Sequence, residues 1–445
     1  MEATDGTPLG ASATAASNGV LERSLSGKRP VQKIRELLFR RSERRKPPTR
    51  VGLFGLFGCG NLGNDGSLEA MLEFLRQVRP DAEIVCICAD VELVRRNHDV
   101  EALPIDWSPS PGHRSGGARA SLFKLPGKFL DLFATIRRAW NIDLLIVPGT
   151  GILDDFGERP WGMPYHLLKW CAAARLTGTE IAFVSIGAGP INHPVSRWLM
   201  TSAARLAQYR SYRDSISKEY MAGTGLDVSR DQIYPDIAFS LPSPQLAAKK
   251  SEAEVLTVGV GVMSYSGWYN FADSGGSIYS AYVDKITRFI IWLLDRGNRV
   301  RILTGETSDG RAVSDIRQAI SNVRPDFADH RIVVEPAASL QDLLRHVADT
   351  DVVVATRFHN VVCALKLGRP TISLGYAQKN DVLLADMGLG QFCQHIEKLN
   401  LDLLYEQFLE LVSQRKEYEQ TVRTMITVYA DRLEMQNSVL LANFL

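Results

Sequence analysis

Short apolar runs alternate with longer amphipathic stretches along most of the chain. The run at 51–54 is followed by Leu68, Met71, Leu72 and Leu75, the i, i+3, i+4, i+7 spacing of a helix that packs on a sheet. The alternation continues with strands predicted at Ile84–Cys88, Asp143–Val147 and Ile181–Ile186, and helices at about 127–140, 161–176 and 194–208. Continuous apolar strands that alternate with helices predict a parallel sheet covered on both faces.

The same rhythm restarts after a polar, proline-containing stretch at 241–254, which we interpret as an interdomain linker. Further strands are predicted at Val255–Val262, Val300–Leu303, Ile332–Val334, Val352–Ala355 and Thr371–Leu374. A chain of 445 residues also exceeds what one hydrophobic core usually serves. We therefore predict an α/β fold of two Rossmann-like, doubly wound domains that face a cleft, a GT-B-like arrangement. The predicted parts are an N-terminal tail at 1–50, domains at 51–242 and 253–395, and a C-terminal helix at 396–445 that packs back on the first domain, with one long helix over 401–435.

The N-terminal tail differs in composition from the rest of the chain. Residues 1–20 are rich in Ala, Ser, Thr and Gly and are predicted to be disordered. The stretch Arg23–Arg50 has 11 Lys and Arg against 2 acids. We interpret it as a solvated basic tail, with a short amphipathic helix on an anionic membrane as the alternative. The basic residues could give the protein peripheral contact with such a membrane. Residues 51–445 carry a net charge of −5, which argues against nucleic acid as a partner.

The six cysteines show no spacing that suits zinc, so no metal site is predicted. Cys86 and Cys88 lie two apart in a predicted strand, and we expect both to be buried and inert in a reducing compartment. No apolar run approaches the roughly 20 residues that span a bilayer, and the N-terminus does not resemble a secretory signal. We expect a cytoplasmic protein.

The first candidate for chemistry is the glycine-rich turn at 58–66, between the first strand and its helix. Glycines let backbone N–H groups approach a ligand, and Asn61, Asn64 and Asp65 could bond sugar hydroxyls. Tight-turn geometry alone would explain the glycines equally well. The turn at 148–155, after the third strand, could likewise bind a ligand, or it could be only a turn with a carboxylate that caps the next helix.

Charged residues follow two further strands. Arg213 ends a short strand beside Asp214, a pattern more often seen in a local ion pair than in a ligand clamp. Arg357 and His359 directly follow the strand Val352–Ala355 and are the strongest candidates, because Arg can hold a carboxylate or phosphate bidentately and His can trade protons near neutral pH. A surface Arg with a capping His is the alternative. Lys379 follows the next strand and could reach the same pocket.

Seven short motifs in order resemble those of the polysaccharide pyruvyl transferase family. Their positions here are Gly60–Gly66, Gly149–Asp155, Ser185–Pro190, Arg213-Asp214, Asp236–Phe239, Arg357–His359 and Tyr376–Lys379. The resemblance covers roughly 51–390. Two departures lie in the first half: Asn64 stands between Gly63 and Asp65, and Gly149-Thr150-Gly151 replaces a triple glycine.

This resemblance implies transfer of a pyruvyl group from phosphoenolpyruvate, as substrate and without a cofactor, to hydroxyls of a glycan or lipid-linked saccharide. By resemblance, Arg213, Arg357 and Lys379 hold the donor on the second-domain side, and His359 is the general acid. The first domain is the acceptor side, through Asn61, Asn64 and Asp65. The basic tail could then attach the protein to the inner face of the membrane. Two other functions remain open: a GT-B glycosyltransferase that uses a nucleotide-sugar, and a non-catalytic sugar-binding member of the family.

Overall fold

The structure is a computed structural model that describes residues 49–106, 124–245, 255–268, 275–326 and 331–445. The tail predicted to be disordered, nearly all of the basic stretch and most of the predicted linker lie outside these residues. Residues 48–433 form one compact unit, which contains every strand of both sheets. Residues 434–445 fall outside this unit.

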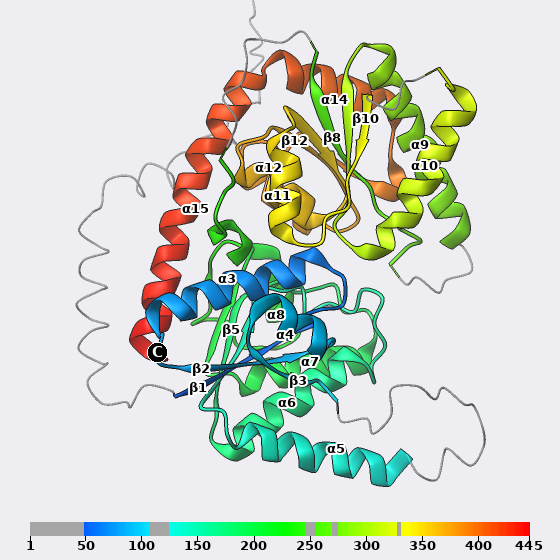
Figure 1. Ribbon diagram of the computed structural model, residues 1–445. Coiled ribbons are helices and arrows are strands. Elements are labelled where there is room, and N and C mark those ends of the chain that lie inside the picture. Colours follow the sequence, from blue (N-terminus) through cyan, green and yellow to red (C-terminus); the bar gives the residue numbers. More distant parts are fainter. Residues whose placement is uncertain (1–48, 107–123, 246–254, 269–274, 327–330) are drawn as a thin grey trace, which may run out of the picture. The chain divides into compact units, whose positions relative to one another are not determined.

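The first half contains a seven-stranded, all-parallel sheet in the order β3-β2-β1-β4-β5-β6-β7 (Figure 1). Its strands are β1 (Arg50–Phe54), β2 (Glu83–Cys88), β3 (Glu101–Pro104), β4 (Leu144–Pro148), β5 (Glu180–Ile186), β6 (Tyr209–Tyr212) and β7 (Gln232–Ile233). Its helices are α3 (Leu62–Val78), α4 (Val91–His98), α5 (Lys124–Ala139), α6 (Met163–Thr177), α7 (Pro194–Leu206), α8 (Ser215–Gly223) and the 3₁₀ turn η3 (Ile237–Ser240). The strand order reverses between β1 and β4, which is where open parallel sheets bind ligands.

The second half contains a six-stranded parallel sheet in the order β10-β9-β8-β11-β12-β13. Its strands are β8 (Thr257–Gly261), β9 (Arg299–Leu303), β10 (Ile332–Val334), β11 (Val352–Ala355), β12 (Thr371–Gly375) and β13 (Cys393–His395). Its helices are α9 (Gly275–Asp295), α10 (Gly310–Val323), α11 (Leu340–Ala348), α12 (Phe358–Lys366), α13 (Lys379–Asp386) and the 3₁₀ turns η4 (Thr307–Asp309) and η6 (Ile396–Lys398). Here the order reverses between β8 and β11.

Two parallel sheets with alternating helices confirm the predicted α/β fold class. The strands that the sequence did not predict are short: β3, β7 and β13 have four, two and three residues. The longer strands were predictable because they are buried along their length; all five residues of β4 are buried. Cys86 and Cys88 are buried as expected, and burial raises the pKa of each thiol to about 12, so both are inert.

The C-terminal segment corrects one prediction. In place of a single helix over 401–435, α14 (Leu401–Ser413) ends at Gln414 and α15 (Arg415–Asn443) follows. Within the compact unit, α15 contacts both halves: Arg432 donates to the backbone oxygen of Ile233 at 2.8 Å, and Tyr429 donates to Asp386 at 3.1 Å. The predicted domain boundaries stay a prediction.

None of the helices in the described residues is both long enough and apolar enough to cross a bilayer.

Candidate active site

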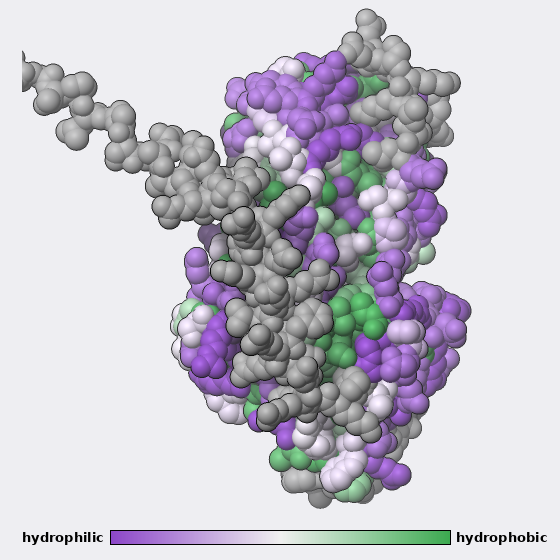
Figure 2. All heavy atoms as spheres, turned by 90° about the vertical axis from the view of Figure 1, so that its left-hand side faces the viewer, coloured by the Kyte–Doolittle hydropathy of each residue, from purple (hydrophilic) through white to green (hydrophobic). Residues whose placement is uncertain are grey.

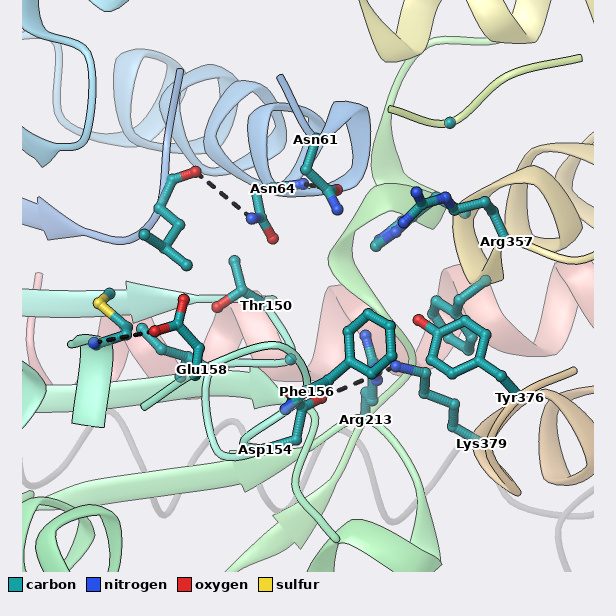
Figure 3. Close-up of a pocket in the computed structure, with 17 residues that line it drawn as sticks. Asn61, Asn64, Thr150, Asp154, Phe156, Glu158, Arg213, Arg357, Tyr376 and Lys379 are labelled. Carbon is teal, nitrogen blue, oxygen red and sulfur yellow. Dashed lines mark hydrogen bonds and ion pairs between the residues drawn. The ribbon is translucent and has the colours of Figure 1, made fainter. Parts of the chain in front are cut away.

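The carboxyl ends of the strands in both halves meet at one cavity of 160 Å³. Figure 3 shows Arg213, Arg357 and Lys379 converging on this space, with Asn61 and Asn64 on the opposite wall. His359 lines it as well. Parallel strands bring their following loops to one edge of a sheet, so residues far apart in sequence become neighbours here.

Hydrogen bonds between backbones join the two halves beside this cavity. The loop after β1 meets the loop after β9: the N–H of Leu62 donates to the oxygen of Gly305 at 3.0 Å, and the N–H of Thr307 donates to the oxygen of Gly60 at 3.0 Å. These reciprocal bonds hold the loops of the two halves together beside the cavity.

The three polar residues predicted in the first loop have different roles in the structure. Asn61 caps α3, since its side-chain oxygen accepts from the N–H groups of Gly63 and Asn64 at 3.0 and 3.3 Å. Asn61 and Asn64 line the cavity. The Asp65 carboxylate accepts from the N–H of Gly58 at 2.7 Å and so stabilises the turn. Asp65 is not among the residues that line the cavity.

Arg213 reaches the cavity from the end of β6. Its side chain is 3% exposed, and Nη1 donates to Asp236 at 3.1 Å. The guanidinium lies over the ring of Phe358, 4.1 Å from its centroid, an arrangement that favours a cation. A Cβ atom on Gly187 would lie 2.5 Å from Arg213 Nη2, so the glycine after β5 makes room for this side chain. Nε makes no hydrogen bond within the described residues, although Asp214 lies 3.6 Å away.

Arg357 is held by two carboxylates from the loop after β9. Asp309, which is fully buried, accepts from Nε at 3.0 Å and from Nη2 at 2.7 Å, and Glu306 lies 2.6 Å from Nη1. Burial acts to lower the pKa of Arg357, but Asp309 and Glu306 outweigh it, so the pKa is raised and the charge is secure. The Glu306 side chain is 28% exposed and also accepts from Asn61 Nδ2 at 3.4 Å.

His359 lies in the first turn of α12 and is almost fully enclosed. Its Nε2 is 3.8 Å from Asp236, too far for a hydrogen bond, and has no hydrogen-bond partner within the described residues. Burial, together with the smaller effects of Arg213, Lys379 and Arg357, lowers the pKa of His359 to about 4, while Asp236 acts in the opposite direction. The imidazole is therefore neutral near pH 7 before any ligand binds.

Lys379 begins α13, and its ammonium lies 3.9 Å from Asp154 and 4.9 Å from the centre of the Tyr376 ring. Asp154 also accepts from the N–H of Phe156 at 3.2 Å. Burial raises the pKa of Asp154, against the lowering effect of Lys379. This carboxylate is thus loosely bonded and easier to protonate than an exposed aspartate.

Aromatic side chains from both halves close one side of the cavity. Phe156 of the first half stacks on Tyr376 at 4.9 Å between ring centroids and meets Trp268 edge-on at 5.2 Å. The Trp268 indole N–H donates to Asp155 at 3.2 Å. The cluster shields the charges from water, which strengthens their interactions.

The structure brings together Asn61, Asn64, Arg213, Arg357, His359 and Lys379, and leaves Asp65 in the adjoining turn. The partner carboxylates Asp154, Asp236, Glu306 and Asp309 were not predicted as site residues. Asp154 and Asp236 did leave a signal, since each lies in one of the seven motifs. In the described residues, no group of three or more His, Cys, Asp or Glu is arranged to hold a metal ion.

Residues 61–378 match the family described as "Polysaccharide pyruvyl transferase". No curated protein matches the chain. The match spans most of the chain and includes every cavity residue discussed above except Lys379, which directly follows it.

Solved structures show the same fold at low sequence identity. UDP-GlcNAc 2-epimerase from Methanocaldococcus jannaschii is 10% identical, with a TM-score of 0.52 over 81% of this chain and 91% of that one. S. aureus MnaA with UDP is 11% identical, with a TM-score of 0.52 over 84% and 90%. A glycosyltransferase from Rickettsia africae is 11% identical, with a TM-score of 0.52 over 89% and 99%. These similarities show the two-domain fold alone.

Proposed function

Because the chain belongs to the polysaccharide pyruvyl transferase family, we propose that it moves a pyruvyl group from phosphoenolpyruvate to hydroxyls of a glycan or lipid-linked saccharide and releases phosphate. The observation that most supports this proposal is the meeting of Arg213, Arg357, Lys379 and His359 at one cavity. These residues supply fixed positive charge and a titratable group where an anionic donor would need both.

The size and charge of the donor suit the cavity. Phosphoenolpyruvate carries about three negative charges near neutral pH, from one carboxylate and one phosphate. The 160 Å³ of space would hold on the order of ten water molecules, comparable to the about ten non-hydrogen atoms of the donor.

Donor binding requires an exchange of partners, because carboxylates already accompany the cations. Glu306 at Arg357 is partly exposed, and Asp154 lies 3.9 Å from Lys379, so each of these two contacts can be given up. Asp309, buried and bonded to two guanidinium nitrogens, stays in place. The donor carboxylate and phosphate would replace Glu306 and Asp154, and a bidentate guanidinium contact would fix the orientation of the donor.

His359 would deliver the proton that activates the donor. The donor brings negative charge close to the imidazole, which raises its pKa from about 4 and favours uptake of a proton. Transfer of that proton from Nε2 to the methylene carbon converts it to a methyl group and leaves the adjacent carbon electron-poor. A sugar hydroxyl adds there and gives its proton to the now neutral imidazole of His359, and the bond between that carbon and the phosphate oxygen breaks. For a ketal, a second hydroxyl adds at the same carbon and its proton leaves with phosphate.

The acceptor would approach from the first half. Asn61 and Asn64 line that wall, and Glu158 of the same half, whose pKa is raised by burial, also lines the cavity. Amides and carboxylates are suitable partners for sugar hydroxyls. Asp65 would act through the shape of the turn. We place the reaction in the cytoplasm, without a cofactor, with the basic tail as a further candidate for attachment to the inner face of the membrane.

The test is to incubate the protein with phosphoenolpyruvate and a panel of oligosaccharide and lipid-linked acceptors while following phosphate release and product mass. Proton NMR then separates a ketal, with its methyl signal, from the isomeric enol ether, with its methylene signals. Three of the solved structures of similar fold have titles that name bound UDP or UDP-GlcNAc. Release of a nucleoside diphosphate from a nucleotide-sugar, with no phosphate from phosphoenolpyruvate, would identify a glycosyltransferase. Sugar binding without donor binding would identify a non-catalytic member.

A further inference from the structure

Helix α5 is packed with its polar side inward. Asp131 and Thr135, one turn apart, are buried, with residue exposures of 8% and 1%. Leu130 and Phe133 are 55% and 68% exposed, and Trp140, directly after the helix, is 72% exposed. Leu130, Phe133, Arg137 and Trp140 follow the spacing i, i+3, i+7, i+10, which places them in one stripe of the helix.

The inward side is held by a buried ion pair with the neighbouring helix α6. Lys169 donates to the Asp131 carboxylate at 2.7 Å and to the backbone oxygen of Ile105 at 3.2 Å, and its side chain is 1% exposed. The desolvation cost of such a pair is large, and apolar residues at the same place are often at least as stabilising. Apolar residues were available in this helix, yet they lie on the outer side. The packing of α5 against α6 does not explain why the polar residues face inward and the apolar residues face outward.

Outside the buried ion pair these two helices are positively charged. Besides Lys169 and Asp131, which neutralise each other, α5 and α6 carry five Lys and Arg and no Asp or Glu. Residues 51–445 as a whole carry a net charge of −5, so this helix pair stands out against the rest. Arg137 of α5 is exposed, and so are Arg175 and Leu176 near the end of α6, Leu176 by 74%.

We propose that this outer side, which we call the α5 face (Leu130, Phe133, Arg137, Trp140, Arg175 and Leu176), docks on the surface of an anionic lipid membrane. Helices with Leu, Phe and Trp beside Arg lie in the plane of the lipid interface, with the apolar groups among the upper acyl chains. Trp is favoured at that depth, and each basic residue near an anionic surface adds attraction. Figure 1 shows α5 at the lower end of the first half, and Figure 2 shows hydrophobic and hydrophilic residues side by side at that end.

The proposal differs from membrane attachment through the basic tail, because that attachment would be electrostatic alone. Salt above physiological strength screens exposed charges and would release the tail. Insertion of Phe133, Leu130 and Trp140 would persist. The proposal is also independent of the pyruvyl transfer chemistry, since none of the α5 face lines the cavity.

The test mixes the full chain with vesicles of phosphatidylcholine alone or with 30% phosphatidylglycerol. Each mixture is measured at low salt, where the Debye length is about 10 Å, and at high salt, where it is about 3 Å. We expect co-sedimentation with the anionic vesicles, part of which survives high salt. Leu130→Ser/Phe133→Ser should lower the partition coefficient at least tenfold and abolish the salt-resistant part. The matched control Val323→Ser/Leu409→Ser removes two side chains of 62% and 52% exposure in the second half and should bind as the unchanged protein does. A blue shift of tryptophan emission on vesicles should be lost in Trp140→Phe, which leaves the other six tryptophans in place.

Equal binding of the Leu130/Phe133 variant and the unchanged protein at both salt levels would overturn the proposal. So would failure of the unchanged protein to bind either vesicle. A change in oligomeric state of that variant, by light scattering, without a change in vesicle binding would instead assign the face to a second copy of the chain. Phosphate release with a water-soluble acceptor should be the same in all variants, so failure of the pyruvyl transfer proposal would be seen separately, as no release by any of them.

Discussion

His359 packs against the backbone of Gly63 across the cleft, so closely that a Cβ atom on Gly63 would lie 1.9 Å from His359 Nδ1. Gly63 is in the first turn of α3 in the first half, and His359 is in the first turn of α12 in the second. The imidazole can take this position only because residue 63 has no side chain. The first glycine-rich loop thus shapes the position of the proposed general acid, as well as forming the wall proposed for the acceptor.

Gly63→Ala should therefore lower turnover at least tenfold, because the methyl group must displace the imidazole or hold the halves apart. The matched control is Gly223→Ala in α8, where a Cβ atom meets nothing within 4 Å. That change should keep turnover and add about 0.5–1 kcal/mol of stability. Single-turnover rates and melting temperatures of both variants check this; normal turnover in Gly63→Ala would show that the contact is dispensable.

Replacing His359 itself should separate chemistry from binding. His359→Ala should reduce turnover by about 100- to 10,000-fold, the usual scale for a general acid, and leave donor affinity at pH 8 nearly unchanged. A merely structural imidazole would behave differently: its loss would lower the melting temperature and leave the turnover of folded molecules intact. Measuring both quantities on the same preparation distinguishes the two.

Donor binding should also take up a proton. The pKa of His359 is about 4 in the free protein and is expected to rise when the anionic donor binds. Between these two pKa values the complex holds more protons than the free protein, so donor affinity should increase as pH falls through the higher value and level off below about 4. Calorimetric titrations in buffers of different ionisation enthalpy report the uptake. His359→Asn should remove it and leave only the contribution of the donor phosphate; equal uptake in both proteins would contradict the assignment.

Arg357→Ala should cost stability as well as donor binding. Its removal leaves the fully buried carboxylate of Asp309 without its guanidinium, a loss of about 3–5 kcal/mol for a broken buried pair. The double variant Arg357→Ala/Asp309→Asn should recover part of the lost stability and none of the donor affinity. Arg357→Lys should rescue binding only in part, since an ammonium cannot reproduce the fork. Unfolding in urea and donor titration measure the two effects.

Glu306→Gln should strengthen donor binding several-fold. In the free protein Glu306 neutralises Arg357 Nη1, where the donor would bind, and an amide competes less for a guanidinium than a carboxylate does. The conservative change retains the oxygen that can accept from Asn61. Calorimetry of phosphoenolpyruvate binding, with Glu335→Gln as an exposed arginine-paired control, checks the prediction. A large loss of affinity would show that Glu306 assists the donor rather than competes with it.

The fold and the positively charged residues of the site could be predicted because both follow from short, continuous stretches of the sequence. Val352–Ala355 is recognisable as a buried strand by itself, and residues directly after a parallel strand lie at the ligand edge of the sheet, which located Arg357 and His359. The partners were not predictable in the same way. Asp309 is 48 positions from Arg357, in a loop where a carboxylate suits a helix start equally well.

The break at Gln414 was missed because apolar spacing continues on both sides of it. The polar inner side of α5 escaped prediction because Lys169, which neutralises the buried Asp131, lies in another helix.

The site is assembled from residues of both halves of the chain, and this limits how members of the family can be recombined. Arg213 and Asp236 belong to the first half, while Phe358 and His359, their partners across the cavity, belong to the second. A chimaera joined near residue 245, with the first half of one relative and the second half of another, would inherit a donor site assembled from two lineages. Exchange of acceptor preference by swapping halves therefore requires that the Arg213–Phe358 and Asp236–His359 pairs be transferred together. Grafting the loop at 55–66 alone would leave both pairs intact as long as Gly63, which packs against His359, is retained.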